Sequence, residues 1–212
     1  MRGSFITLEG IKGSGKSTQL TLLGEHLTKH NIAHRLVRDP GSTALGDKIR
    51  ELILSNFSLT EMTAMTEVLL YTAARSQLVS EHIIPAIEAG EVVICDRYID
   101  SSLVYQGYAA DIDPITIRKI NDLVFDKVWP SRTYLLDVDV SLSQQRLKSR
   151  GRKVDRMEAR EIEFQERVRN GYLHLAKSEP ERYITIDATQ SEATITTSIW
   201  ADMKALLGAI DD

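Results

Sequence analysis

Hydrophobic and polar positions alternate along this chain in a repeating order of short apolar runs and longer helical stripes. The apolar runs that predict buried strands occupy residues 5–8, 33–37, 91–95, 133–138 and 183–186. Between them, apolar residues recur at the three- and four-residue spacing of amphipathic helices. The helices predicted in this way cover residues 16–30, 44–55, 61–79, 80–89, 114–126, 141–149, 159–177 and 191–207. Strands that alternate with helices predict an α/β fold, in which helices cover both faces of a parallel sheet.

Composition narrows the class of protein. The 212 residues suit a single domain, and 42% of them are hydrophobic, enough for a core without disulfides or structural metals. The net charge of −4 is spread along the chain, which argues against binding to a nucleic-acid backbone. No apolar stretch approaches the length of a membrane span, and residues 1–9 predict a strand instead of a signal peptide. The lone Cys95 lies in an apolar run and is expected to be buried. We therefore expect a cytoplasmic protein with neither a membrane nor a nucleic acid as partner.

A phosphate-binding loop follows the first predicted strand, because residues 10–18 fit the pattern G-x-x-x-x-G-K-[ST]. Glycines let such a loop curl so that backbone N–H groups face the phosphates, and the next helix adds its positive dipole end. Lys16 is expected to contact the β- and γ-phosphates of ATP, and Ser17 to bind Mg²⁺. The predicted ATP-binding residues are Gly10, Ile11, Lys12, Gly13, Ser14, Gly15, Lys16, Ser17 and Thr18. The loop alone does not separate a kinase from a molecular switch or a motor.

Further polar segments lie where ligands bind in parallel α/β folds, beyond the carboxyl ends of the strands. Residues 38–43 form a Pro–Gly turn with charged neighbours after the second strand. Tyr71 and Arg75 share one helix face, where a ring and a guanidinium can hold a base. Asp96 ends the third strand and is placed to hold Mg²⁺, while Arg97 can bind a second phosphate. Taken singly, each segment is equally typical of an ordinary turn, a surface cation–aromatic pair or a strand-end ion pair.

Residues 148–158 are dense in arginine and unlike the helices predicted on either side. Phosphoryl transfer spreads negative charge over the moving group, so an arm that brings arginine to bound substrates would stabilise the transition state and exclude water. A solvated run of charges is the simpler interpretation of such a segment. The arginines in and beside this segment are Arg146, Arg150, Arg152 and Arg156.

In this order and spacing, the segments resemble the thymidylate kinase (dTMP kinase) family of P-loop nucleoside monophosphate kinases over nearly the whole chain. The matching positions are residues 10–18, 38–43, 73–75, 96–98, 105–107, 155, 156 and 158. The resemblance implies a single kinase domain over residues 1–212, a three-layer αβα P-loop fold with a five-stranded parallel sheet, and a lid at about 148–158. It also implies transfer of the ATP γ-phosphoryl group to dTMP, giving dTDP and ADP, with Mg²⁺ as cofactor and a homodimer as the assembly.

The resemblance assigns roles to individual residues. The catalytic residues it implies are Lys16, Arg97, Arg150 and Arg152, and the metal ligands are Ser17 and Asp96. The acceptor-binding residues it implies are Arg38, Asp39, Pro40, Tyr71, Arg75, Arg97, Ser102, Tyr105 and Gln106. Among these, Tyr71 would stack on the base, Arg75 would donate to it, and Tyr105 would exclude a ribose 2′-OH.

Three departures from the family pattern gather around the acceptor. Lys12 stands where the family usually carries a carboxylate that binds the sugar 3′-OH, and a lysine offers no acceptor. Asp39 and Ser42 replace a commoner glutamate and glycine, and residues 108–110 lack an arginine of related chains. Because these changes face the acceptor, dUMP, another deoxypyrimidine monophosphate or a nucleoside stays open as an alternative substrate. A nucleotide-binding regulator without turnover is a second, less favoured alternative.

Overall fold

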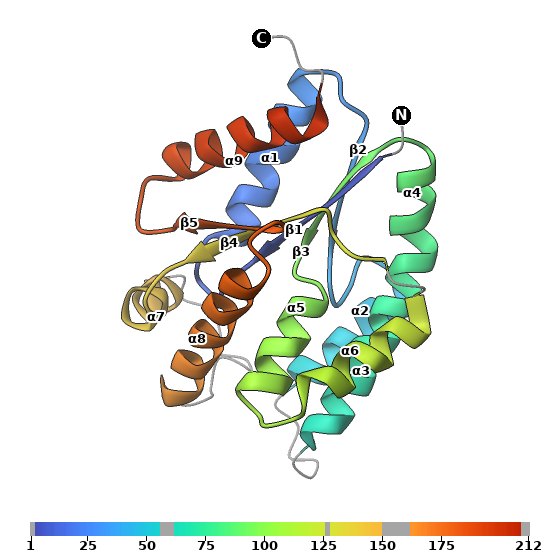
Figure 1. Ribbon diagram of the computed structural model, residues 1–212, viewed down its shortest axis with the longest axis vertical. Helices are drawn as coiled ribbons and strands as arrows, with labels where there is room; N and C mark the ends of the chain where they lie inside the picture. Colours follow the sequence, from blue (N-terminus) through green and yellow to red (C-terminus); the bar gives the residue numbers. More distant parts are fainter. Residues whose placement is uncertain (1–2, 56–61, 126–127, 150–161, 209–212) are drawn as a thin grey trace.

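The computed structural model describes all residues except 1–2, 56–61, 126–127, 150–161 and 209–212. Five strands pair in parallel in one sheet, whose order is β2-β3-β1-β4-β5. These strands are β1 (Ser4–Glu9), β2 (His34–Arg38), β3 (Val92–Asp96), β4 (Arg132–Asp137) and β5 (Tyr183–Asp187). The predicted α/β class and five-stranded parallel sheet are therefore confirmed (Figure 1).

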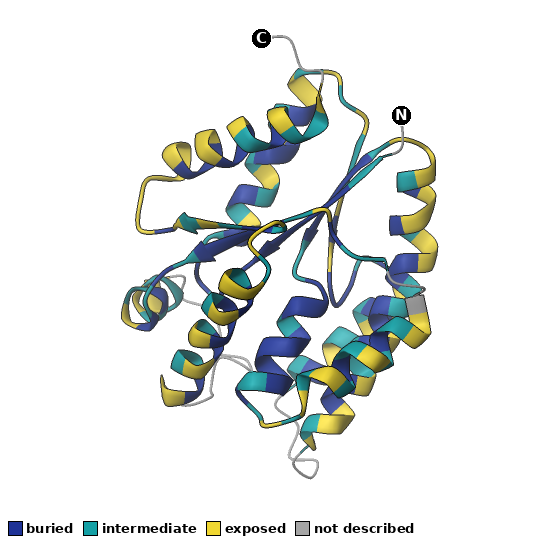
Figure 2. Cartoon of the chain, viewed as in Figure 1, coloured by how far each residue is buried: buried dark blue, intermediate teal, exposed yellow. Residues whose placement is uncertain are grey.

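Helices cover both faces of the sheet and make the three layers of the fold. They are α1 (Lys16–Lys29), α2 (Ala44–Leu54), α3 (Ala64–Leu78), η1 (Val79–Ile83), α4 (Ile84–Glu88), α5 (Ile99–Ser102), η2 (Leu103–Tyr108), α6 (Pro114–Phe125), α7 (Val140–Ser149), α8 (Ile162–Ser178) and α9 (Glu192–Leu207). α1 and α9 lie on one face, whereas α4, α5 and α8 lie on the other (Figure 1). Buried residues face the sheet and exposed ones face away from it (Figure 2). No helix in the described ranges is long and apolar enough to cross a membrane.

Burial on both faces of the sheet explains why its central strands are continuous apolar runs in the sequence. β1 lies between β3 and β4, and in the pairing of β1 with β3, Ile6 lies opposite Ile94. Both of these side chains are fully buried, as is Leu8 at the end of the same strand. A parallel sheet with helices on both faces buries both sides of its central strands, so their residues are apolar without alternation. The core therefore fixes β1, and with it the start of the phosphate-binding loop.

α9 packs along α1, the helix that begins in the phosphate-binding loop. Gln19 of α1 donates from Nε2 to the carbonyl of Glu192 at 3.0 Å, and its Oε1 accepts from Thr196 Oγ1 at 2.8 Å. Farther along, the Trp200 ring lies 5.1 Å from that of His26 and 4.9 Å from that of His30, measured between ring centroids. One side of α1 is thus covered by the sheet and another by α9.

Residues 64–88 form one continuous helical run, although the sequence predicts two helices over 61–79 and 80–89. The run passes from α3 through the π-helical turn η1 into α4, and the Ile84 N–H donates to the carbonyl of Val79, five residues back. Pro85 follows and has no N–H to donate. A π turn beside such a residue lets the helix continue instead of ending.

Residues 99–108 form a helical segment, α5 and η2, that the sequence analysis did not predict. Its signal is the apolar spacing of Ile99, Leu103 and Gly107, which are four residues apart. Gly107 is needed for close packing, because a Cβ there would lie 3.3 Å from Pro114 Cγ of α6. The segment presents its other side to the ligand pocket described below.

Candidate active site

Three glycines with positive φ shape the phosphate-binding loop between β1 and α1. Gly10, Gly13 and Gly15 have φ of 138°, 84° and 102°, which residues with a side chain rarely adopt. A Cβ on Gly10 would lie 2.5 Å from the carbonyl oxygen of Leu136, and one on Gly13 would lie 2.8 Å from that of Ser143. The end of β4 and the start of α7 therefore press on the loop and hold its curled form.

Lys16 begins α1 and folds back over the loop. Its Nζ donates to the carbonyl of Gly10 at 3.0 Å and to that of Ile11 at 2.9 Å, and the residue is 6% exposed. Burial, followed by the nearby charge of Arg97, lowers the pKa of Lys16 to about 7. The negative charge of a bound triphosphate would raise this pKa again. Nucleotide binding is therefore expected to recharge the lysine.

Ser17 and Asp96 bring two oxygen-bearing groups together beside the loop. Ser17 Oγ donates to Asp96 Oδ2 at 3.0 Å, and Asp96 Oδ1 is buried with no hydrogen-bond partner among the described residues. A hydroxyl and a carboxylate with an unpaired oxygen fit Mg²⁺, which keeps several waters and binds substrate phosphates. The described part of the chain contains no cluster of three His, Cys, Asp or Glu residues that could hold a metal. This pair thus fits an ion that arrives with ATP better than a resident metal.

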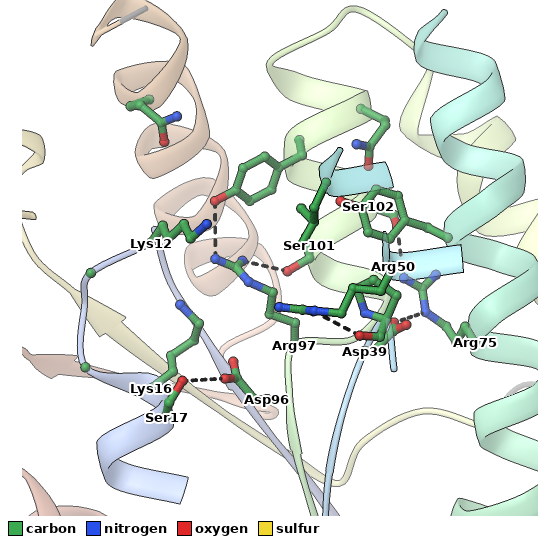
Figure 3. A pocket seen from close by; sticks show the side chains of 18 residues that line it. Lys12, Lys16, Ser17, Asp39, Arg50, Arg75, Asp96, Arg97, Ser101 and Ser102 are labelled. Atoms are coloured by element: carbon green, nitrogen blue, oxygen red, sulfur yellow. Dashed lines mark hydrogen bonds and ion pairs between the residues drawn. The ribbon is translucent and has the colours of Figure 1, made fainter. Parts of the chain in front are cut away.

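A strongly cationic pocket extends from the loop to the far side of Arg97. Figure 3 shows Lys16, Ser17 and Asp96 on one side of Arg97, and Asp39 and Arg75 on the other. The cationic residues that line the pocket are Lys12, Lys16, Arg50, Arg75 and Arg97, and the acidic ones are Asp39 and Asp96. In a chain with a net charge of −4, this local excess of positive charge suits two phosphate-bearing ligands side by side.

Arg97 follows β3 and lies at the centre of the pocket. Its φ of 71° is unusual for a residue with a Cβ, and its backbone N–H donates to the carbonyl of Leu8 at 3.0 Å. Nη1 donates to Ser101 Oγ and to Tyr172 OH, each at 3.0 Å, and Nη2 donates to Tyr105 OH at 3.3 Å. All three partners are neutral hydroxyls, so the positive charge of Arg97 stays available to a ligand.

Arg75 is 1% exposed and is anchored to four groups of the protein. Nε donates to Asp39 Oδ2 at 2.5 Å, and Nη1 donates to Asn121 Oδ1 at 2.7 Å. Nη2 donates to Ser102 Oγ at 2.9 Å and to the carbonyl of Tyr98 at 3.3 Å. An arginine carries five N–H groups, so within the described part of the chain one N–H on Nη1 is left for a ligand. Burial raises the pKa of Asp39, and the charge of Arg75 opposes that rise.

The far wall of the pocket offers complementary groups to a base. Gln106 donates from Nε2 to Glu67 Oε2 at 2.8 Å, while its Oε1 is buried with no partner in the described ranges. Together with the spare N–H of Arg75, this wall presents one acceptor and one donor. Thymine and uracil carry an N3–H beside a carbonyl, which matches that pair, whereas N3 of cytosine is itself an acceptor. Tyr71 lines the same pocket and offers a ring face.

The pocket brings together most residues predicted for the two ligand sites. Those that line it are Lys12, Gly13, Gly15, Lys16, Ser17, Asp39, Pro40, Tyr71, Arg75, Asp96, Arg97, Ser102, Tyr105 and Gln106. The remaining predicted loop residues, Gly10, Ile11, Ser14 and Thr18, belong to the loop and to α1 but are not among the lining residues. The predicted lid at 148–158 lies almost wholly outside the described residues, and with it Arg150, Arg152 and Arg156.

Arg38 does not line the pocket, contrary to its predicted role at the acceptor phosphate. Its Nη2 donates to Asp47 Oδ1 at 2.9 Å, and its side chain is 51% exposed. The reason is strand alternation, since Val37 is buried and the next side chain along β2 points the opposite way.

Arg50 of α2 was missed by the sequence analysis and lines the pocket. Its Nη1 donates to the carbonyl of Pro40 at 2.9 Å, which ties α2 to the turn after β2. Gly46 and Arg50 are four residues apart, so they share one helix face, and Gly46 is buried. A charged residue on the inward face of an amphipathic helix was the available signal.

Comparison with known proteins places the chain in a family. A family model described as thymidylate kinase matches residues 8–199. The thymidylate kinase of Exiguobacterium sibiricum is 45% identical over 207 residues, covering 98% of this chain and 97% of that relative. The thymidylate kinase of Deinococcus radiodurans is 44% identical over 200 residues, covering 94% of this chain and 96% of that relative. The crystal structure of thymidylate kinase from Ehrlichia chaffeensis superposes with a TM-score of 0.75 at 33% identity, covering 96% of this chain and 99% of that one. The resemblance inferred from the motifs is confirmed, and the chain belongs to the thymidylate kinase family.

Proposed function

We propose that this protein transfers the γ-phosphoryl group of ATP to the phosphate of dTMP, forming dTDP and ADP. The observation that carries the proposal is that the phosphate-binding loop and Arg97 open on one pocket. A triphosphate held by the loop and a monophosphate held by Arg97 would meet end to end, as direct transfer between them requires. The wall beyond Arg97, with Tyr71 and Gln106, is suited to the base of the acceptor.

The mechanism is direct in-line transfer without a covalent enzyme intermediate. Lys16 binds the β- and γ-phosphates and offsets charge that builds up on the leaving side. Arg97 holds the acceptor phosphate so that one of its oxygens faces the γ-phosphorus. A general base is not needed, because a phosphate monoester is largely ionised near neutral pH. We assign the rate enhancement mainly to positioning and to fixed positive charge.

Mg²⁺ and the lid complete this proposal. Ser17 and Asp96 would hold the ion, and its role when bound is to neutralise phosphate charge during transfer. The predicted lid at 148–158 would bring Arg150 and Arg152 to the transferred group. The single sheet supports a single kinase domain. The use of ATP and the fully buried, unpaired Cys95 are in keeping with a location in the cytoplasm.

An acceptor panel tests the function. ADP release is measured with dTMP, dUMP, dCMP and thymidine at matched concentrations, with Lys16→Ala as the control for contaminating kinases. The expected result is turnover with dTMP at the highest kcat/KM and none with thymidine, which lacks the phosphate that Arg97 binds. A higher kcat/KM with dUMP than with dTMP would identify dUMP as the acceptor in place of dTMP. ATP binding without ADP release for any acceptor would refute it and favour a regulator.

A homodimer is proposed from the face formed by α2, α3 and α6, which lie side by side (Figure 1). Large apolar side chains are exposed there, and Leu123 of α6 is 86% exposed. Others on the same three helices are Leu45, Leu52, Met65, Leu69, Ile115 and Val124. Exposed apolar residues gathered on adjacent helices are typical of an interface between subunits. Sedimentation analysis should give a dimer that Leu123→Glu converts to a monomer, and a monomeric wild-type protein would exclude this assembly.

A further inference from the structure

A buried group of three oxygen-bearing side chains lies behind Arg97. We name Glu9 of β1, Ser101 of α5 and Tyr172 of α8 the Glu9 cluster. Glu9 is fully buried, and its Oε2 accepts from Ser101 Oγ and from Tyr172 OH, each at 2.8 Å. Its Oε1 accepts from the backbone N–H of Tyr98 at 2.8 Å. Burial, with the charge of Asp100 nearby, raises the pKa of Glu9 to about 7. Above that pH, the carboxylate is an acceptor with three donors aimed at it.

The two hydroxyls of the Glu9 cluster also receive the side chain of Arg97. The two hydroxyls also lie 2.8 Å from each other, and when each directs its one hydrogen toward Glu9, its lone pairs are free to accept from Nη1 of Arg97. The carboxylate therefore orients the guanidinium through an intervening layer of hydroxyls. A direct Arg97–Glu9 pair would occupy the arginine and compete with a phosphate. With two N–H groups on the hydroxyls and one on Tyr105, the Nε–H and one Nη2–H have no partner among the described residues and remain for an anion.

The backbone around Arg97 is held by the same end of β1. The N–H of Arg97 donates to the carbonyl of Leu8, and the next N–H, of Tyr98, donates to Glu9. The φ of 71° at Arg97 lies in the left-handed region that a residue with a Cβ rarely adopts, so it persists only where surrounding contacts determine it. Glu9 directly precedes Gly10, the first residue of the phosphate-binding loop. The end of β1 thus fixes both the phosphate-binding loop and Arg97.

We propose that Glu9, acting through the hydroxyls of Ser101 and Tyr172, is the positioning residue that aims Arg97 at the acceptor phosphate and sets its place relative to the phosphate-binding loop. This inference deepens the proposed function and rests on it. Glu9 and Tyr172 act through Arg97 and do not contact the reacting atoms themselves. The cluster therefore predicts losses confined to ligands that carry the acceptor phosphate.

Tyr172→Phe tests the cluster with little change in packing, because the ring stays and one hydroxyl is removed. Binding of dTMP and of thymidine is measured by competition at about pH 8, where Glu9 is ionised. We expect Tyr172→Phe to weaken dTMP about ten- to a hundredfold, the effect of losing a hydrogen bond to a charged group. Thymidine binding and the KM for ATP should stay within about twofold of wild type, since neither ligand uses the acceptor grip of Arg97.

Tyr134→Phe is the matched control. Tyr134 is also fully buried, and its OH also donates to a carboxylate, Asp202 Oδ2 at 2.6 Å, but on the other side of the sheet from Arg97's partners. It should lower the thermal midpoint without changing the ratio of dTMP to thymidine affinity. Equal loss of both ligands in Tyr172→Phe, or an unchanged ratio, would show that the Glu9 cluster serves only the fold.

Glu9→Gln supplies an independent arm. All three partners of Glu9 donate to it, and glutamine has one acceptor oxygen where the carboxylate has two. At least one donor must then turn away, so the lone pairs offered to Arg97 are disturbed. We expect the same selective loss of dTMP, and the double variant with Tyr172→Phe should lose less than the product of the two single effects. Multiplicative losses would overturn the relay. Wild-type turnover of dTMP tests the proposed function separately, because the affinity ratio can be measured whether or not dTMP is phosphorylated.

Discussion

Replacing Arg75 by methionine should destabilise the protein far more than replacing a comparable surface arginine. The Arg75–Asp39 pair is buried, with both side chains 1% exposed; Arg75 binds Asp39 Oδ2, and Asp39 Oδ1 has no hydrogen-bond partner in the described ranges. Arg75→Met keeps a long side chain but leaves the Asp39 carboxylate without its ion-pair partner. Removing one member of a buried pair costs about 3–5 kcal/mol. For a chain of this size each kcal/mol lowers Tm by about 2–4 °C, so the expected drop is about 6–20 °C.

Arg38→Met is the control for that experiment. Arg38 and Asp47 form a pair of the same chemistry at 2.9 Å, but their side chains are 51% and 46% exposed. Solvent screens such a pair, and its loss should cost at most about 1 kcal/mol. Thermal and urea unfolding of both variants supply the measurement. Adding Asp39→Asn to Arg75→Met should recover part of the loss, because the unpaired charge is then gone. Similar losses in the two single variants, or a double variant as unstable as the sum of the singles, would refute the reasoning.

Four further predictions concern residues of the phosphate-binding loop. Lys16→Ala should lower kcat about a hundredfold or more, and steady-state activity within tenfold of wild type would contradict its phosphate role. Burial lowers the pKa of Lys16 to about 7 in the free protein, so ATP binding at about pH 8 should be accompanied by uptake of close to one proton. Titration calorimetry in buffers of different ionisation enthalpy measures this uptake. No proton uptake would mean that the charge of Lys16 does not change on ATP binding. Gly10→Ala should cost about 1–3 kcal/mol in chemical denaturation, because its φ is 138° and a Cβ would meet a backbone oxygen. Gly24→Ala, whose Cβ would meet only the end of the Leu36 side chain, should cost less. Lys12→Asp should lower the KM for dTMP by restoring an acceptor at that position, and a raised KM would assign Lys12 a role of its own.

Much of the fold could be predicted because its strands are buried on both sides. Apolar runs identified all five strands to within about one or two residues, and the phosphate-loop pattern identified the first turn. The helical segment at residues 99–108 was missed because its polar residues were interpreted as a binding segment, although Ile99 and Leu103 carry a helical spacing. The break expected near residue 80 was wrong because a π turn ahead of Pro85 keeps the helix continuous, which a three- to four-residue period does not reveal.

Site residues could be predicted from the sequence only where they belong to local sequence motifs. Lys16, Ser17 and Arg97 stand in such motifs at strand ends and line the pocket. Glu9 and Tyr172, which meet 163 residues apart in the chain, carry no local pattern that links them. Arg38 was wrongly placed for the opposite reason, since it lies in a motif but on the outward face of its strand.

The contact of α9 with α1 has a consequence for how the protein is made. Gln19 and Glu192 are hydrogen-bonded although they lie 173 residues apart in the sequence. During synthesis, α1 therefore leaves the ribosome long before α9, the helix that covers it, has been made. Until then the nascent chain exposes the side of α1, including His26, that Trp200 of α9 later covers. Shielding by a chaperone would matter most in that interval.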